Sequence, residues 1–274
     1  MLEQMKYKNH INEVFEFGKD GIYVDTSDIH DYEWKVITKN NKIASIGYTV
    51  VKRTLPITII CDTEENGTVA KNRLFEVMEK DVLAMKPGQI VVGDYYMKGF
   101  VTKSVKKEYL ISKRYMKIEL TVTTDSPCWI KETTTPYGIM SDIGNSPWLD
   151  FNMDFPIDYY SDMASKAVIN TSFVPSNFRL IIYGECVNPS VNIAGHTYQV
   201  NCNVGANEFL TIDSSTKKVF LTANDGAVIN QFNNRNRDSY IFEKIPAGSN
   251  VVTWNRDFSF DVILLEERSE PKWT

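Results

Sequence analysis

The sequence predicts a mainly β chain with one helix, arranged as two domains. Helical spacing is clear in one stretch only, at about 68–85, and segments rich in β-branched and aromatic residues fill the rest of both halves. Between the halves, residues 136–165 are punctuated by Pro and Gly and keep no period. We therefore expect an N-terminal α+β domain over 1–135, a connector over 136–165 and an antiparallel β-sandwich over 166–274.

The helix prediction rests on the spacing of apolar residues between Thr68 and Met85. Positions three and four apart fall on one face of a helix, and here they are Leu74, Val77, Met78, Val82 and Met85. The segment Lys86-Pro87-Gly88 contains the residues that end helices. We expect this helix to pack its apolar face on a sheet.

Strands are expected on both sides of the helix. Before it come "WKVITKN", "ASIGYTVVKR" and "LPITIICD", the last of which leads to the helix through the turn-rich "TEENG". After it, residues 89–125 contain two or three strands rich in Val, Ile, Thr and Tyr. The first half is therefore predicted to be a β-rich domain with a single helix.

The second half reads as short strands only. Segments such as "NFRLIIYGE", "NEFLTIDS" and "FSFDVILLEE" recur at the spacing of about 8–12 residues that is typical of sandwiches. In "LTIDSSTKKV", Asp213 to Ser215 are expected to turn the chain, and Lys217 and Lys218 begin the return strand. These features favour a compact antiparallel sandwich.

Composition excludes several classes of protein. The 274 residues are 43% hydrophobic and 24% charged, with a net charge of −5, which argues against a general nucleic-acid binder. The N-terminus has no apolar leader segment, and no apolar run reaches the length of a membrane span, so neither secretion nor direct membrane binding is expected. Four scattered cysteines without a C-x-x-C pair are expected to be free thiols.

No catalytic, cofactor-binding or metal-binding residue is predicted. The nucleotide, hydrolase and metalloprotease motifs are missing, and His10, His30 and His196 lie far apart in the sequence. Asp150, Asp154 and Asp158 are spaced four apart, but Pro156 opposes a helix there, so solvated carboxylates are the better interpretation.

Basic residues are concentrated between Lys98 and Lys117, where Glu108 is the only acid. Two strands joined by a basic tip fit this segment. One interpretation is a row of edge-strand lysines that blocks unwanted sheet pairing, and the other is an arm that contacts an acidic neighbour or a nucleic-acid backbone. We favour the first for most of these lysines and retain the segment as an assembly element. The candidate contacts are Lys103, Lys106, Lys107, Lys113 and Arg114.

The last residues, "FSFDVILLEERSEPKWT", combine a strand that is apolar on both faces with a charged close. Val262 to Leu265 are expected to form the last core strand, which should stop before Pro271. Glu266, Glu267, Arg268 and Glu270 are expected at the surface. Trp273 is expected to dock, either on the first domain or on a neighbouring subunit, because its burial is worth about 2–3 kcal/mol.

Ordered features of the second half resemble those of the distal tail protein family of long-tailed bacteriophages. They are the "GECVNP" turn, the "LTIDSSTKKV" hairpin, the "IPAGSNVVTW" turn into a strand and the "ERSEPKW" close. The first half fits in kind, as a β-rich domain with one helix and a long hairpin. The resemblance spans nearly the whole chain, and its specificity comes from the order of these features.

The resemblance implies a structural protein without a cofactor or an enzymatic activity. Its N-terminal domain would form a ring, typically hexameric, and its C-terminal domain would be a galectin-like β-sandwich. The ring would join the tail tube protein to the baseplate hub or tail-tip protein, with receptor-binding proteins as further candidate partners. The protein would be made in the cytoplasm of the bacterial host and located in the virion, at the distal end of the tail.

Two other functions remain open from the sequence alone. A carbohydrate-binding protein would recognise a bacterial surface polymer through the sandwich, where Tyr198, Phe209, Trp254 and Phe258 could form a stacking platform. Aromatic residues at alternate strand positions are more often core residues, and we expect that here. A cell-wall hydrolase would need only two suitably spaced carboxylates, and no pair stands out.

Overall fold

The structure, a computed structural model, describes residues 5–138 and 167–272. Contacts divide the chain into two units, one formed by 1–131 with 267–274 and the other by 132–266. The sequence prediction had placed the first boundary at 135 and the last eight residues in the sandwich. No Pro- or Gly-rich linker marks the observed boundaries, because they fall within or next to strands β10 (Trp129–Tyr137) and β21 (Ser259–Arg268). Most of the predicted connector lies outside the described residues.

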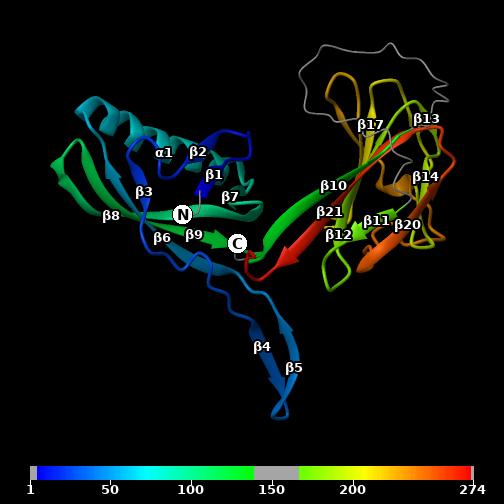
Figure 1. The fold of residues 1–274 in the computed structure, drawn as a ribbon, viewed down its shortest axis with the longest axis horizontal. Helices are drawn as coiled ribbons and strands as arrows, with labels where there is room; N and C mark the ends of the chain where they lie inside the picture. The colour runs from blue at the N-terminus through cyan, green and yellow to red at the C-terminus, as the bar shows by residue number, and fades with distance from the viewer. Residues whose placement is uncertain (1–4, 139–166, 273–274) are drawn as a thin grey trace. The chain divides into compact units, whose positions relative to one another are not determined.

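The first unit is built from antiparallel strands and one helix (Figure 1). Strands pair in the order β3-β6-β9-β8 and again in the order β8-β7-β1-β2, so that the long β8 belongs to both runs. The bounds are β1 Met5–Lys8, β2 Val14–Glu16, β3 Ile22–Val24, β4 Lys35–Lys39, β5 Lys42–Gly47, β6 Val51–Ile60, α1 Glu64–Ala84, β7 Gly88–Val92, β8 Tyr95–Ser112 and β9 Tyr115–Thr124. The prediction of a β-rich domain with a single helix is confirmed among the described residues.

Helix α1 packs on these strands through the predicted face, with two corrections. Leu74, Val77 and Met78 are buried in one core with the strands, as expected. Met85, however, is 79% exposed and adopts a left-handed conformation that caps the helix C-terminus. The helix also starts earlier than predicted, at Glu64, because the Thr63 side chain accepts a hydrogen bond from the Asn66 amide and caps the first turn.

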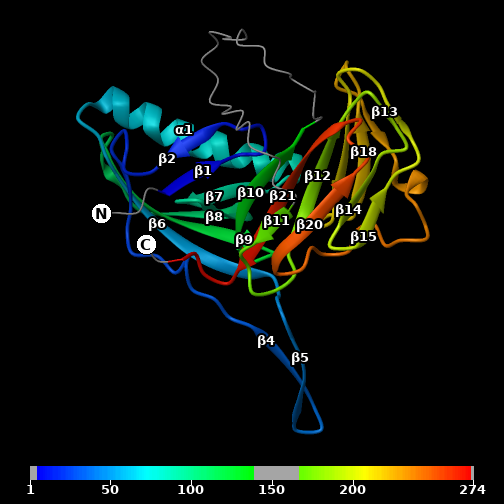
Figure 2. The same ribbon diagram turned by 45° about the vertical axis from the view of Figure 1, so that its right-hand side comes forward.

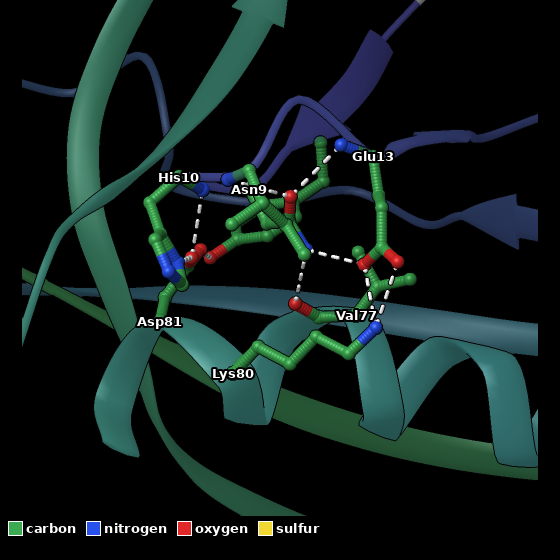
Figure 3. A network of polar contacts seen from close by, with 8 residues as sticks. Asn9, His10, Glu13, Val77, Lys80 and Asp81 are labelled. Carbon is green, nitrogen blue, oxygen red and sulfur yellow. Dashed lines mark hydrogen bonds and ion pairs between the residues drawn. The ribbon is translucent and has the colours of Figure 1, made fainter. Parts of the chain in front are cut away.

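A buried carboxylate near the end of α1 holds the β1–β2 loop against the helix (Figure 3). Asp81 is fully buried; it accepts hydrogen bonds from the Tyr7 hydroxyl at 2.6 Å and from the His10 amide at 2.8 Å, and it contacts the His10 ring. Burial, followed by the hydrogen bond to this carboxylate, raises the pKa of Tyr7 far above its ordinary value, so that the phenol stays protonated. The buried carboxylate of Asp81 thus receives hydrogen bonds from Tyr7 on β1 and from His10 in the β1–β2 loop.

The same loop is tied to the helix at a second point (Figure 3). The side-chain amide of Asn9 donates to Glu13 at 2.7 Å and to the carbonyl of Val77 at 3.3 Å. Lys80 completes the contact with an ion pair to Glu13 at 2.7 Å. The β1–β2 loop is therefore closed on the helix by polar contacts as well as by packing.

The second unit is an antiparallel sandwich. One sheet has the order β19-β18-β17-β12-β21-β10 and the other the order β11-β20-β14-β15, with the short β13–β16 pair beside them. The remaining bounds are β11 Ala167–Asn170, β12 Asn177–Tyr183, β13 Cys186–Val187, β14 Ser190–Ile193, β15 His196–Gln199, β16 Asn203–Val204, β17 Phe209–Asp213, β18 Lys218–Thr222, β19 Val228–Asn230, the 3₁₀ turn η1 Phe232–Asn234 and β20 Gly248–Trp254. Alternating residues of both sheets form one core, which confirms the predicted sandwich.

The predicted hairpin of the sandwich is present as β17–β18. Asp213 accepts hydrogen bonds from the amides of Ser215 and Thr216 at 2.9 and 3.0 Å and from the Ser215 hydroxyl at 2.7 Å. Burial alone would raise the pKa of Asp213, but these hydrogen bonds and the nearby Arg179 outweigh it and hold the pKa below its ordinary value. The carboxylate is therefore the centre that fixes this turn.

The last strand behaves largely as expected. Val262 to Leu265 are buried, and β21 ends at Arg268, before Pro271. Glu266, expected at the surface, is instead 6% exposed and accepts a hydrogen bond from Thr171 at 3.3 Å. After Glu266 the chain belongs to the first unit, where Pro271 is buried.

Candidate assembly surfaces

The structure brings the five basic candidates together on one hairpin of the first unit. Lys103, Lys106 and Lys107 lie on β8, and Lys113 and Arg114 form its turn into β9. Beyond Gly99, β8 pairs only with β9 among the described strands, so its other side is an edge. Register shifts between Val101 and Ser112 add the irregularity that edge strands commonly carry.

Contacts within the unit already engage most of these basic groups. Lys107 pairs with Glu119 at 3.3 Å, Lys113 with Glu64 at 3.5 Å, and the Lys106 ammonium lies 4.7 Å from the centre of the Phe75 ring. The Arg114 guanidinium donates to the carbonyl of Cys61 at 3.0 Å. Lys103 is exposed and faces solvent. Most of the set thus stabilises the hairpin, and its role in assembly stays a prediction.

The tip of this hairpin is pressed against the start of α1. A Cβ on Gly67 would lie 2.4 Å from the carbonyl oxygen of Lys113, which leaves room for glycine only. Lys71 reaches the same tip from the helix and donates to the carbonyls of Lys113 and Tyr115 at 2.8 and 3.0 Å. The basic hairpin is therefore a fixed part of the first unit. Trp273, the sixth candidate, lies outside the described residues.

A second hairpin, β4–β5, carries the stronger signal for assembly. It projects from the start of β6, on the side away from α1 (Figures 1 and 2). Every residue from Lys35 to Ile46 is exposed, and among the described strands β4 and β5 pair only with each other. Asn40 and Asn41 form its tip with positive φ of 53° and 59°, as a tight two-residue turn requires. An isolated two-stranded hairpin is only marginally stable in water.

The two faces of this hairpin differ in chemistry. Val36 pairs with Ile46 and Thr38 with Ile43, so these side chains share one face. Ile43 and Ile46 are three apart and would point to opposite sides of a regular strand, but a register shift after Ile37 puts them together. The other face carries Lys35, Ile37, Lys39 and Lys42. The hairpin is thus apolar on one face and mainly basic on the other.

The apolar face is large enough to favour association. Val36, Ile43 and Ile46 are 49%, 64% and 54% exposed. Fully burying each such side chain contributes about 1.5–3 kcal/mol, so covering the exposed half of these three is worth roughly 3 kcal/mol. The sequence analysis identified both strands but missed their role. The sequence did contain a signal for that role. The Asn-Asn pair predicts a tight turn between two strand segments, and no neighbouring segment is available to cover their apolar residues.

The base of the hairpin is held by aromatic stacking and by the C-terminal segment. The rings of Trp34 and Tyr48 stack with centroids 4.5 Å apart. The side chain of Tyr48 lies near Glu267 and Ser269 of the C-terminal segment, and burial raises the pKa of Tyr48. The charged close of the sequence therefore contributes to the first unit, next to the point where the hairpin leaves it.

A groove of about 450 Å³ lies at the opposite end of β6, beside the start of α1. Three exposed apolar side chains line it: Tyr23, Ile60 and Val69, at 48%, 54% and 60% exposure. The exposed carboxylates of Asp20 and Asp62 line it too, and neither forms an ion pair within the described part of the chain. Its two cations are engaged, since Lys19 pairs with Glu16 and Arg73 donates to the carbonyl of Val14.

The histidines and cysteines have structural surroundings. His10 contacts Asp81, His30 stacks on Trp129, and His196 hydrogen-bonds the carbonyl of Tyr240. The four cysteines are free; burial raises the pKa of Cys186 to about 11, so its thiol stays protonated at neutral pH. Over residues 5–138 and 167–272, no group of three or more His, Cys, Asp or Glu is placed to hold a metal ion. No helix in that part of the chain is long and apolar enough to cross a membrane.

The aromatic residues considered for glycan stacking do not form an exposed platform. Tyr198 and Phe258 are 1% and 2% exposed and belong to the sandwich core. Trp254 packs edge-on against Tyr137 and Phe260, and its indole donates to the carbonyl of Phe258 at 3.1 Å. Tyr198 and Phe258 are therefore core residues, as their alternation in the strands suggested, whereas Trp254 and Phe209 are partly buried.

Solved structures of phage proteins share this fold over nearly the whole chain. The crystal structure of the SPP1 Dit protein (gp 19.1), described as a paradigm of the hub adsorption apparatus in phages that infect Gram-positive bacteria, matches with a TM-score of 0.57 and 10% identity. The match covers 97% of this chain and 99% of the SPP1 chain.

Chains of the phage P2 baseplate in its activated conformation match as well. The calcium and strontium forms give TM-scores of 0.65 and 0.64, each at 10% identity over 99% of this chain and 100% of the other. No protein-family model and no curated protein matches the sequence. The chain therefore has, over nearly its full length, the fold of the SPP1 Dit protein and of a phage P2 baseplate protein.

Proposed function

We propose that this chain is a structural protein of a bacteriophage tail tip, which assembles with copies of itself into a ring, hexameric by analogy with the resembled family. The ring would connect the tail tube protein to the baseplate hub or tail-tip protein, at the distal end of the tail. The observation that carries the proposal is the fold shared with the SPP1 Dit and phage P2 baseplate proteins over 97–99% of the chain.

The surfaces of the first unit support self-assembly in particular. A closed ring needs two different complementary patches on each subunit, because its contacts are head-to-tail. The first unit has two exposed apolar surfaces at opposite ends of β6, one convex and one concave. The second unit, which is a two-sheet sandwich with its own core, would then remain available for other tail proteins, including receptor-binding proteins.

A non-catalytic role fits the chemistry of the described residues. The histidines, the buried Asp81 and the buried thiols are all engaged in packing or in hydrogen bonds that serve the fold. Solved structures that share this fold include the SPP1 Dit protein and phage P2 baseplate proteins. We therefore propose that the protein acts by assembly, without a cofactor.

Electron microscopy of the purified full-length chain tests the proposal. We expect ring-shaped particles whose class averages show rotational symmetry, and we expect the rings to bind purified tail tube protein in a pull-down. Particles that remain monomeric at every concentration and bind no tail component would contradict it.

A further inference from the structure

We propose that the β4–β5 hairpin of one subunit docks in the groove beside α1 of a second copy of the same chain. This inference rests on the proposed ring and specifies its contact. The hairpin is defined as residues 35–47, and the groove as the surface lined by Tyr23, Ile60, Asp62 and Val69 together with Asp20.

The two surfaces match in their apolar content. The hairpin offers Val36, Ile43 and Ile46 on one face, all about half exposed or more. The groove offers three exposed apolar side chains of its own, Tyr23, Ile60 and Val69. Its volume of about 450 Å³ would accommodate several side chains, since about 10–15 Å³ measured with a water-sized probe is enough for one water molecule.

The two surfaces also match in charge. Residues 35–47 contain three lysines and no acid, and Lys39 and Lys42 flank the tip, from which their long side chains extend past the edge of the hairpin toward the rim of a groove that the apolar face enters. In the groove, Lys19 is paired with a glutamate of its own subunit, and Arg73 donates to a backbone carbonyl. The exposed carboxylates of Asp20 and Asp62 therefore make the groove surface acidic. Glu65, exposed in the first turn of α1, adds a carboxylate beside Val69, where the nearby Lys113 is already paired with Glu64. Opposite charges at the edge of an apolar contact steer association and fix its register.

A subunit cannot fill its own groove. The hairpin leaves β6 next to Val51, whereas the groove is lined by Ile60 at the other end of the same ten-residue strand. At about 3.3 Å per residue, these ends are about 30 Å apart, and the hairpin extends away from α1, the helix whose start lines the groove (Figures 1 and 2). The occupant must come from another molecule, and a second copy brings a hairpin of the right charge and polarity at the same stoichiometry.

Two variants, one on each surface, test this pairing by mixing. The hairpin variant is Lys39→Glu/Lys42→Glu, which keeps like charges opposite each other in the turn. The groove variant is Asp62→Lys/Val69→Lys. Matched controls are Lys217→Glu/Lys244→Glu, exposed in the sandwich, and Glu79→Lys/Leu83→Lys, exposed on α1 outside the groove. Melting temperatures of all four full-length variants are measured first, to show that each folds.

Each test variant alone is expected to assemble at least ten-fold more weakly than the controls, as measured by sedimentation velocity. Mixed one to one, they should assemble at least ten-fold more strongly than either variant alone, because each pair has one intact hairpin facing one intact groove, and the reversed charges of the other contact are opposite as well. Wild-type rings formed by either variant alone, or a mixture that assembles no more strongly than its components, would overturn the pairing while leaving the proposed function intact. A wild-type chain that never assembles would contradict both.

Photo-crosslinking in the unaltered ring gives a second readout that does not depend on losing assembly. A benzophenone amino acid at position 43 should crosslink to the segment 60–73 of another copy, identified by mass spectrometry of mixed light- and heavy-isotope subunits. The same group at position 83, exposed on α1, serves as the control. Crosslinks from position 43 that form only within a subunit, or only to other segments, would overturn the proposal.

Discussion

The β1–β2 loop and the β4–β5 hairpin both leave the strands of the first unit for a few residues, but they end in opposite surroundings. The loop is closed on α1, where Asp81, Tyr7 and His10 satisfy one another in a buried network. The hairpin exposes Val36, Ile43 and Ile46 to solvent, and its two strands pair with no other strand in the described part of the chain. Residues of the first kind determine whether the subunit folds, and residues of the second kind determine what the folded subunit binds.

Removing the buried carboxylate tests the first half of this comparison most strongly. Asp81→Ala is expected to lower the free energy of unfolding by about 3–4 kcal/mol, because it leaves the Tyr7 hydroxyl and the His10 amide buried without their acceptor. Urea unfolding followed by fluorescence measures this loss. Glu79→Ala, exposed on the same helix, is the control, and an equal effect of both changes would contradict the anchoring role of Asp81.

Substituting one glycine beside the Asp81 network and one in the β4–β5 hairpin compares the two regions directly. Gly88→Ala is expected to destabilise the unit by about 1–3 kcal/mol, because its Cβ would lie 2.3 Å from the Asp81 carboxylate and 2.4 Å from the Tyr7 oxygen. Gly47→Ala in the hairpin meets no atom within 4 Å and is expected to have no measurable cost. Thermal melts of the two variants measure both effects, and a Gly47 variant as unstable as the Gly88 variant would show that the hairpin is packed.

Acidity provides a smaller test on the sandwich, whose β17–β18 turn is another closed network. The folded-state pKa of Asp213 is lowered, so its contribution to stability is present above the unfolded pKa of about 4 and is lost as the pH falls through the folded value. Asp213→Asn is expected to cost about 1 kcal/mol at pH 7 and to reduce the loss of stability below about pH 4. Chemical unfolding at pH 3 to 7 measures this, and parallel pH profiles of variant and wild type would argue against the network.

The smallest expected effect on stability belongs to the apolar face of the hairpin. Ile43→Ser/Ile46→Ser should change the free energy of unfolding of the isolated subunit by less than about 0.5 kcal/mol, since both side chains are more than half exposed. Calorimetry at a concentration too low for assembly measures this value. A large destabilisation would mean that these side chains support the subunit itself.

Sequence patterns predicted the parts of the fold that depend on residues close together in the chain. The spacing of Leu74, Val77 and Met78 identified the buried face of α1, and Val262 to Leu265 were recognised as a core strand. The Asp213 turn was also predictable, because its hydrogen bonds join residues two and three apart. The early helix start at Glu64 was missed because "TEENG" was interpreted as a turn, although Thr63 is a good cap.

Features that depend on distant partners could not be predicted in this way. Asp81 resembles a solvent-facing helix residue in the sequence, and its partners Tyr7 and His10 are 74 and 71 positions away. Ile43 and Ile46 share a face only because of a register shift between β4 and β5, which strand alternation does not reveal. The basic residues of β8 and its turn were found from their clustering, but their engagement by Glu64, Glu119 and Phe75 was not foreseen.

The central claim is that the folded subunit assembles with copies of itself through the exposed hairpin. Sedimentation velocity of the wild-type chain beside Ile43→Ser/Ile46→Ser, across a hundred-fold range of concentration, tests it most directly. We expect the wild type to sediment as one discrete closed oligomer and the variant as a monomer with an unchanged melting temperature. A wild type that remains monomeric, or a variant that forms the same oligomer as the wild type, would contradict the claim.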